Sequence, residues 1–219
     1  MTPRIPLALW TTFVLTLAAL SYSIRFDEGK PDRDTLYRWS TAASGLAQFV
    51  VLGLIVYGIA GLARRRRRDL FALRRPTSWG LAALIAVGIG ITMAVLLYFL
   101  GPLLAPGQEQ GLTPDRWEPA HAAAYVGNGV VVSVAAPIVE ELTFRGLGYS
   151  LLVRFGRWTA IVLVGVLFAL AHGLVDAFPF LAALGSMLAY LRSRVDSVYP
   201  GIAVHGLFNA TALVLAVAG

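Results

Sequence analysis

Long apolar runs separated by short polar segments dominate this chain. A transmembrane α-helix needs about 20 consecutive, predominantly apolar residues. Runs of roughly this length predict spanning helices at 6–24, 42–63, 79–104, 129–153, 158–176, 178–192 and 198–218. No run alternates with a period of two, which argues against strands. The pattern predicts an all-α fold, a polytopic transmembrane bundle of about seven spanning helices.

Three segments refine this prediction. Residues 178–192 are short for a full span, which favours a tilted or partial one. Residues 113–128 are expected to lie along the outer interface before the fourth helix. The first run carries only Arg4 as a basic flank and lacks a small-residue cleavage site, so an uncleaved helix is favoured over a signal peptide.

Composition supports a membrane protein. The chain has 58% hydrophobic and 14% charged residues, whereas a soluble domain has about 25% charged residues. The mean hydropathy is +0.72. The absence of cysteine excludes disulfides and thiolate metal sites. A metal would therefore need His, Glu, Asp or Asn ligands, and the three histidines are His121, His172 and His205.

The net charge of +6 could suggest a nucleic-acid partner, but the basic residues follow a membrane pattern. Five arginines occupy positions 64–68 directly after an apolar run, and two more follow at 74 and 75. With the N-terminus inside, twelve basic residues lie on the inner side and five on the outer side, as the positive-inside rule requires. This predicts a multi-pass protein of the cell membrane with a cytoplasmic N-terminus, in contact with the lipid bilayer and not with nucleic acid. Because Lys30 is the single lysine, a high-GC bacterial source and its inner membrane are favoured.

Two adjacent carboxylates stand near the middle of the predicted helix 129–153. Glu141 lies four residues before Arg145, the favourable order for an ion pair within a helix. Glu140 points about 100° away from Glu141, so Arg145 can neutralise one acid and leave the other for chemistry. An architectural ion pair between helices is the alternative, although it leaves the second carboxylate without a reason.

The last predicted helices also carry polar side chains in their central portions. His172 follows an apolar run, and a histidine bonded to a carbonyl at a helix end is its plainest interpretation. His205 and Asn209 are four residues apart and share one helical face. Hydrogen bonding between helices is the alternative for this pair. Three helices thus present acids, imidazoles and an amide at similar depth, whereas His121 is expected to have an interfacial or structural role.

Three motifs occur in order on these helices: E-E-x-x-x-R, F-x-x-x-H and H-x-x-x-N. Together they resemble the CAAX-processing and bacteriocin-processing (CPBP) family of intramembrane endopeptidases, over roughly residues 120–219. The resemblance implies variable N-terminal membrane helices at 1–118 and a CAAX-protease-like catalytic region at 119–219, within one compact bundle. Asp196 departs from it, standing at a turn position where glycine is expected. The motif residues are Glu140, Glu141, Arg145, Phe168, His172, His205 and Asn209.

The resemblance implies a hydrolase that cleaves a peptide bond near the terminus of a membrane-associated protein or peptide. Glu140 would take a proton from water, and His172 would help to hold that water. His205 and Asn209 would donate hydrogen bonds to the oxyanion. Glu141 with Arg145 would orient the site, and Phe168 would support it.

A metal-dependent mechanism is the competing interpretation, with Glu140, His172 and His205 as three ligands to zinc and one position open for water. Asn209 is a poor zinc ligand but a good oxyanion donor, which favours the metal-free glutamate mechanism. A non-catalytic membrane scaffold or bacteriocin self-immunity protein on the same fold is the alternative function, and a small transporter or channel is a second. The complete set of motif residues favours the enzyme over the scaffold. The confinement of the buried polar groups to these motifs disfavours a pore.

Overall fold

The structure, a computed structural model, describes residues 4–28, 34–104, 109, 111, 114 and 116–218. Within these ranges all regular secondary structure is helical and no residue forms a strand. The predicted fold class, a transmembrane helical bundle, is confirmed. The lengths of the apolar runs carried this prediction, because the bilayer fixes how long a spanning helix must be.

Five helical segments are long and apolar enough to cross a membrane. They are α1 (Arg4–Glu28), α2 (Trp39–Gly61), α4 (Trp79–Leu104), the continuous segment Pro119–Phe155 and α11 (Tyr199–Ala218). Two shorter helices, α9 (Arg157–Ala171) and α10 (Phe178–Val195), complete a set of about seven. A single turn, α3 (Arg67–Leu70), lies between α2 and α4.

The fourth span begins earlier than position 129. A turn, η2 (Pro119–His121), leads directly into α6 (Ala122–Val130), so the helix of the fourth span already begins within the stretch 113–128 that was expected at the interface. Proline suits the first turn of a helix because its missing N–H would have no partner there. Asn128 also holds this part of the helix in the bundle, since its side-chain amide donates to the carbonyls of Leu36 at 2.9 Å and Arg38 at 3.0 Å.

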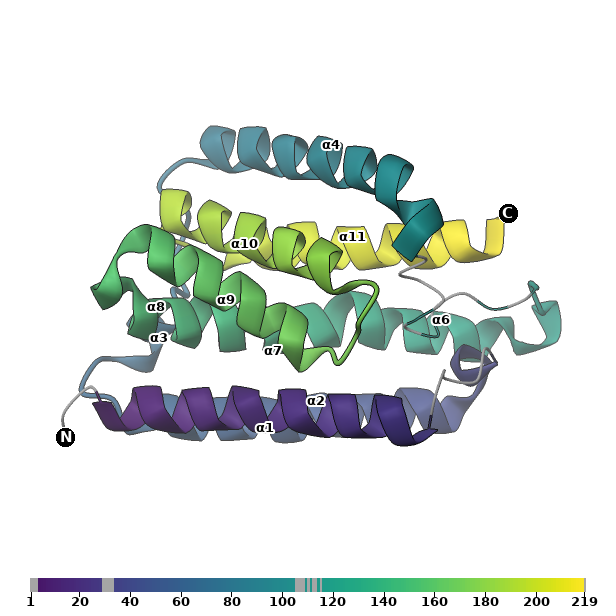
Figure 1. The fold of residues 1–219 in the computed structure, drawn as a ribbon, viewed down its shortest axis with the longest axis horizontal. Helices are drawn as coiled ribbons and strands as arrows, with labels where there is room; N and C mark the ends of the chain where they lie inside the picture. The colour runs from purple at the N-terminus through teal and green to yellow at the C-terminus, as the bar shows by residue number, and fades with distance from the viewer. Residues whose placement is uncertain are drawn as a thin grey trace.

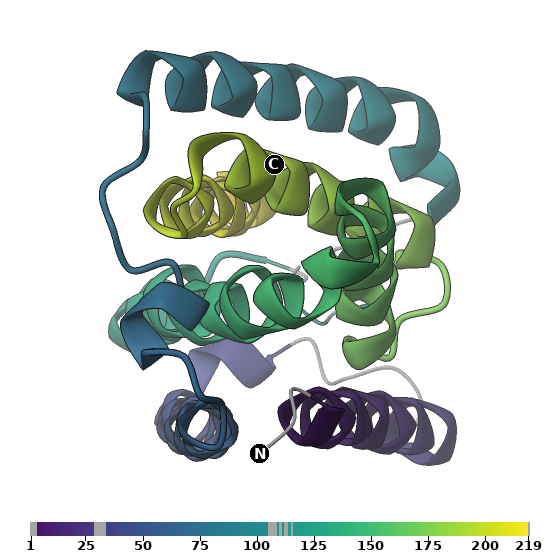
Figure 2. The same cartoon turned by 90° about the vertical axis from the view of Figure 1, so that its left-hand side faces the viewer.

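The helices form stacked layers. Figure 2 shows α4 on one outer face, α1 and α2 on the other, and the remaining helices between them. The closest packing is between α9 and α10, where a Cβ atom added at Gly185 would lie 2.9 Å from the Cα atom of Gly165. Small residues allow such close approach, which supplies van der Waals contact where lipid removes the hydrophobic drive.

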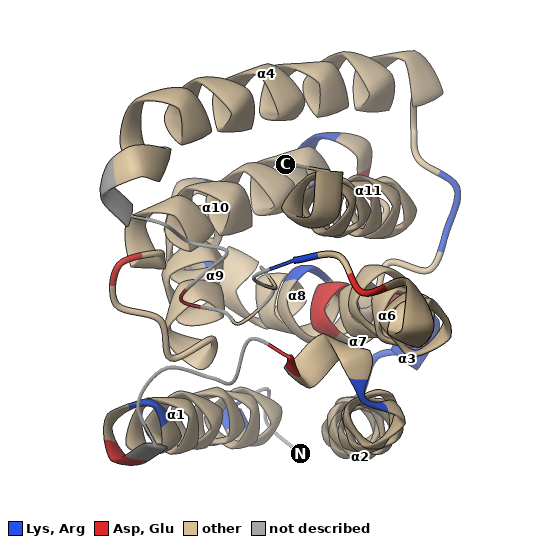
Figure 3. Cartoon of the chain, turned by 90° about the vertical axis from the view of Figure 1, so that its right-hand side faces the viewer, with Lys and Arg blue, Asp and Glu red and all other residues tan. Residues whose placement is uncertain are grey.

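The outer helices expose apolar side chains. Leu54 of α2 is 66% exposed, and Leu84 and Phe99 of α4 are 70% and 67% exposed. Figure 3 shows α4 and α11 free of charged residues along the visible ribbon. Exposure on this scale is expected of surfaces that face hydrocarbon.

One end of the bundle gathers the N-terminus of α1, the connections that flank α3, the start of α9 and the turn between α10 and α11 (Figure 1). Asp196 forms that turn with a φ of +52°, in the left-handed region that favours glycine. Its carboxylate accepts from Arg192 at 2.8 Å and lies 3.3 Å from Arg74. The departure at Asp196 therefore keeps the turn and adds an ion-pair network to it.

Candidate active site

The two acids lie at the end of a short α-helical stretch between two π-helical segments. Glu140 and Glu141 end α7 (Ala136–Glu141), which follows η3 (Val131–Ala135) and precedes η4 (Leu142–Gly148). π-helical turns inside longer helices occur often at functional sites. Here they set the direction in which the two carboxylates leave the helix.

Pro137 explains the first of these segments. The N–H of Ala136 donates to the carbonyl of Val131, five residues back. The next N–H in this register would belong to Pro137, which has none. The carbonyl of Val132 receives the side-chain amide of Asn209 instead, at 2.9 Å. Asn209 of α11 thus replaces the missing backbone donor just before Glu140.

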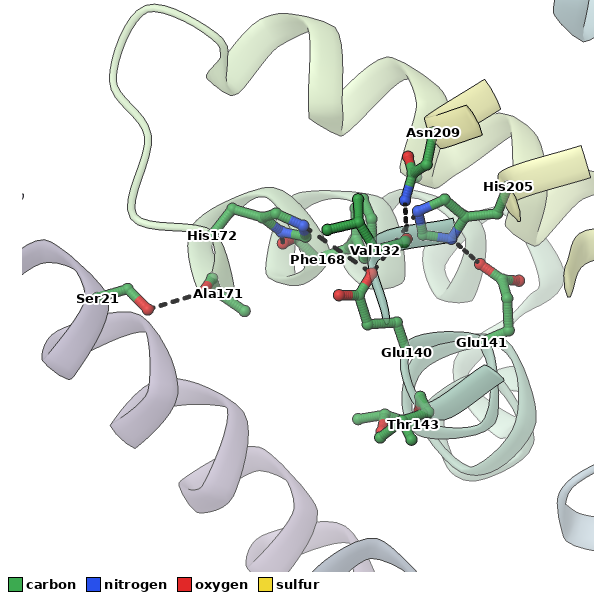
Figure 4. Close-up of polar contacts among 12 residues, drawn as sticks. Ser21, Val132, Glu140, Glu141, Thr143, Phe168, Ala171, His172, His205 and Asn209 are labelled. Carbon is green, nitrogen blue, oxygen red and sulfur yellow. Dashed lines mark hydrogen bonds and ion pairs between the residues drawn. The ribbon is translucent and has the colours of Figure 1, made fainter. Parts of the chain in front are cut away.

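Glu140 faces two imidazoles. Its Oε2 atom lies 3.6 Å from Nε2 of His205 and 4.0 Å from Nε2 of His172. Figure 4 shows the three side chains pointing toward one another from three different helical segments. Both separations exceed a good hydrogen bond, for which N···O distances run to about 3.2 Å.

The second nitrogen of each imidazole already has a partner. Nδ1 of His172 lies 2.7 Å from the carbonyl oxygen of Phe168, which can only accept, so this nitrogen carries a proton. Nδ1 of His205 lies 3.1 Å from Oε1 of Glu141 and donates to it. The other nitrogen of each ring, Nε2, faces Glu140, where it accepts a hydrogen bond in the neutral ring and donates one in the protonated ring.

The second acid is enclosed. Oε1 of Glu141 accepts from Nη1 of Arg145 at 2.7 Å, and both side chains are fully buried. Nη2 of Arg145 donates to the carbonyl of Gly185 at 3.0 Å, and the guanidinium stacks 4.3 Å above the ring of Phe168. The cluster thus combines two carboxylates and one guanidinium with two imidazoles.

One oxygen of this acid has no polar partner among the described residues. Oε2 of Glu141 is buried and unbonded, and a Cβ atom added at Gly201 would lie 2.6 Å from it. The first turn of α11 therefore packs its backbone directly against the carboxylate. Only glycine leaves room for this contact without moving the acid.

Exposure separates the two carboxylates. The side chains of Glu140 and His172 are 19% and 22% exposed, whereas Glu141 and Arg145 have no exposed area. A small molecule can therefore reach Glu140 and His172 but not the ion pair behind them.

The structure brings the motif residues together in two groups. Glu140, His172 and His205 face one another, and Glu141, Arg145 and Phe168 lie behind them. Asn209 reaches the backbone of Val132 and no motif side chain. His121 lies at the start of the fourth span, exposed and 3.1 Å from Glu118.

Three residues that support the cluster were not predicted from the sequence. Pro137 frees the carbonyl that Asn209 binds, Gly185 supplies a carbonyl to Arg145, and Gly201 makes room for Glu141. A proline inside an apolar run was the available signal for the first. Gly201 was visible as part of a Pro-Gly pair, but helix punctuation explains such a pair equally well.

The cluster does not have the geometry of a metal centre. In the described part of the chain, no three His, Asp or Glu side chains are arranged to hold a metal ion. The distance of 4.0 Å between Glu140 and His172 is wide for two ligands of one zinc ion, which bind at about 2.0–2.2 Å in tetrahedral geometry. We therefore derive no step through a metal.

These features define a class: a polytopic membrane protein with a partly open glutamate–histidine cluster backed by a buried ion pair. A family model described as type II CAAX prenyl endopeptidase Rce1-like matches residues 122–211. The match begins in α6, ends in α11 and includes every motif residue, so it confirms the resemblance over that stretch. It supports a CAAX-type intramembrane protease fold and a membrane location. No curated protein and no solved structure matches the chain.

Proposed function

We propose that this protein is an intramembrane endopeptidase of the CAAX type, in which Glu140 activates a water molecule. The observation that carries the proposal is the gap in front of Glu140. Its Oε2 atom lies 3.6 Å from Nε2 of His205 and 4.0 Å from Nε2 of His172, and Nδ1 of each ring is already bonded. We place a water molecule in this gap, where the Glu140 carboxylate and Nε2 of a neutral His172 accept its hydrogens.

Glu140 acts as the base in the first step. Water held between Glu140 and His172 gives one proton to the carboxylate, and its oxygen attacks the scissile carbonyl carbon. The C–N bond of the tetrahedral intermediate then breaks, and Glu140 passes the proton to the leaving nitrogen. The products are a carboxylic acid and an amine.

His205 stabilises the oxyanion in this scheme. The cluster holds two carboxylates and one guanidinium, so one proton on an imidazole would balance their charges. We assign that proton to His205, whose Nδ1 already donates to Glu141, because Nε2–H then becomes a donor to the oxyanion. Asn209 uses one amide hydrogen on Val132, and we assign the other to the same oxyanion.

The substrate class follows from the surroundings. The cluster lies among helices that expose apolar side chains to lipid, so the substrate is a membrane-associated protein or peptide that reaches Glu140 from within the bilayer or its interface. We propose that the basic end of the bundle, which also holds the N-terminus, faces the cytoplasm of a bacterial inner membrane, because arginine clusters favour the inner side. Residues 119–219 form the catalytic region and residues 1–118 its variable partner.

Cleavage of a lipid-anchored peptide in detergent tests the proposal. We expect the wild type to cleave, and Glu140→Gln and His172→Ala to lose roughly 10²–10⁴-fold in rate, as loss of general-base catalysis predicts. Glu118→Gln, a change of an exposed acid outside the cluster, is the matched control and should cleave normally. Equal cleavage by all four proteins would contradict the proposed mechanism, and no cleavage by any would support a non-catalytic scaffold or self-immunity protein. Metal analysis of the purified wild type and addition of a chelator test the zinc alternative.

A further inference from the structure

A cleft lies behind the candidate active site. It has a volume of about 440 Å³, within the range of about 300–1,000 Å³ that small-molecule sites occupy. Its walls come from α2, from α3 and the residues after it, from α7 with the start of η4, and from the first residue of α11. Its lining includes Gly53, Tyr57, Arg67, Arg68, Val139 and Leu142.

The cleft and the glutamate–histidine cluster lie on different faces of one helix. Val139 and Leu142 line the cleft and are three residues apart, so they share a face. At about 100° per residue, this face points roughly opposite to the face that carries Glu140 and Glu141. The cleft is therefore separate from the space in which Glu140 meets the histidines.

The two ends of the cleft differ in chemistry. Its deep part is lined by glycine, aliphatic and aromatic side chains, and Gly53 leaves space there because a Cβ atom would have its nearest contact at 3.7 Å. Arg67 and Arg68 belong to the connection at the basic end of the bundle. The residues of α2 that line the cleft run from Gly53 to Tyr57, so the cleft follows this helix for about 6 Å at 1.5 Å per residue.

The two guanidinium groups are positioned but not neutralised. Nε of Arg67 donates to the carbonyl of Tyr57 at 3.3 Å, and its guanidinium stacks 4.1 Å from the Tyr57 ring. Nε of Arg68 donates to the carbonyl of Leu73 at 2.9 Å. Neither forms an ion pair with a described carboxylate, so their remaining N–H groups can bind an anion.

We infer that this cleft binds an anionic phospholipid of the cytoplasmic leaflet, with one acyl chain along the apolar wall and the phosphate at Arg67 and Arg68. An apolar slot accounts for the chain, and two guanidinium groups without a carboxylate partner among the described residues account for the head group. Basic pockets between membrane helices on the cytoplasmic side recognise such head groups. A bound lipid would bridge α2 and α7, the helix that carries Glu140.

Lipid retention by the full-length protein tests this inference. The protein, purified in detergent, receives phosphatidylglycerol or phosphatidylcholine with identical acyl chains, and native mass spectrometry counts the lipid that stays bound. We expect at least one phosphatidylglycerol per protein and about tenfold weaker retention of phosphatidylcholine, the factor that 1.4 kcal/mol of head-group contact would give.

Two variants locate the site. Arg67→Gln with Arg68→Gln should bring phosphatidylglycerol retention down to the phosphatidylcholine level. Arg64→Gln with Arg65→Gln is the matched control, because it removes the same charge from the same connection but lies outside the cleft. Gly53→Leu fills the apolar wall without changing charge and should reduce retention of both lipids.

Three results would overturn the inference. Equal retention of both lipids by all variants would remove any specific site. Equal loss in the two arginine pairs would reduce the effect to general charge attraction. Displacement of the lipid by a lipid-anchored substrate peptide would assign the cleft to substrate. Because none of these changes touches the glutamate–histidine cluster, a negative result leaves the proposed peptidase activity unaffected.

Discussion

The helices before residue 119 and the helices after it use the same residue types in different ways. Gly58 of α2 has no atom within 4 Å of its would-be Cβ position, and Thr92 of α4 bonds the carbonyl of Gly88 in its own helix at 2.8 Å. In the later region, Gly201 packs on the Glu141 carboxylate, and Asn209 bonds a carbonyl of another helix. A glycine or polar residue in an apolar helix is therefore uninformative until its contacts are known.

The first prediction has the largest expected effect and concerns Arg145, the cation that balances Glu141. Arg145→Met leaves a carboxylate buried without a cation, so we expect a loss of about 3–5 kcal/mol in the free energy of unfolding. Arg194→Met, an exposed arginine of α10, should change stability by less than about 0.5 kcal/mol. Unfolding in mixed micelles measures both variants.

The double variant Glu141→Gln with Arg145→Met sharpens this result. Because it removes both charges, it should be more stable than Arg145→Met alone. If it proves as unstable as the sum of the two single changes, the pair does not act as a unit.

The second prediction compares Gly201, which packs on the Glu141 carboxylate, with Gly58 of α2. Gly201→Ala places a methyl group 2.6 Å from Oε2 of Glu141. The acid must then move away from Arg145 and His205, and we expect a cost of about 1–3 kcal/mol with a fall in kcat of roughly 10²-fold.

Gly58→Ala is the control in the lipid-facing region. Its Cβ position is open, and alanine is the better helix former by about 1 kcal/mol, so stability should stay equal or rise. Equal damage from the two substitutions would contradict the contrast between the regions.

The third prediction compares the polar side chains of Asn209 and Thr92. Asn209→Ala leaves the carbonyl of Val132 without a donor, and we expect a loss of about 1 kcal/mol, the scale of hydrogen bonds between membrane helices. Thr92→Val removes a bond within one exposed helix and should be close to neutral. Thermal unfolding with cleavage rates measures both, and an Asn209→Ala protein of wild-type stability would show that the π-helical segment needs no such donor.

The fourth prediction concerns Glu109, which ties the loop after His172 to α1. Its buried carboxylate accepts from the backbone N–H groups of Val175 at 2.7 Å and Ala177 at 2.8 Å and lies 3.6 Å from Arg25. Burial raises its pKa, but these hydrogen bonds and Arg25 outweigh burial and hold the pKa below the ordinary value.

This stabilisation is present above the unfolded-state pKa and is lost as the pH falls through the folded-state pKa. We expect it to amount to about 1 kcal/mol at neutral pH. Glu109→Gln should lower stability at pH 7 and converge with the wild type in acid. If the stability of the two proteins changed in parallel between pH 7 and acid, the Glu109 carboxylate would not contribute the proposed stabilisation.

Features that depend on neighbours within one helix could be predicted from the sequence. The spans follow from run length, and the Glu141–Arg145 pair follows from four-residue spacing; the structure has it at 2.7 Å. The separation of Glu140 from that pair follows from the same geometry. These features need no knowledge of the other helices.

Features that depend on distant partners could not be predicted. The π-helical turn before Glu140 needs Pro137 together with Asn209, which comes from the last helix. The fourth span begins early because Asn128 finds carbonyls in the connection before α2. The contact between Gly201 and Glu141 likewise joins two segments whose meeting no local pattern reports.

The most direct test of the water-activation mechanism is the cleavage rate of Glu140→Gln, His172→Ala and the double variant, measured as kcat on one lipid-anchored peptide. Because both residues are proposed to act on one water molecule, their losses should not multiply, and the double variant should be about as slow as the slower single variant. A double variant slowed by the product of the two single losses would show that Glu140 and His172 act independently, and would contradict the mechanism.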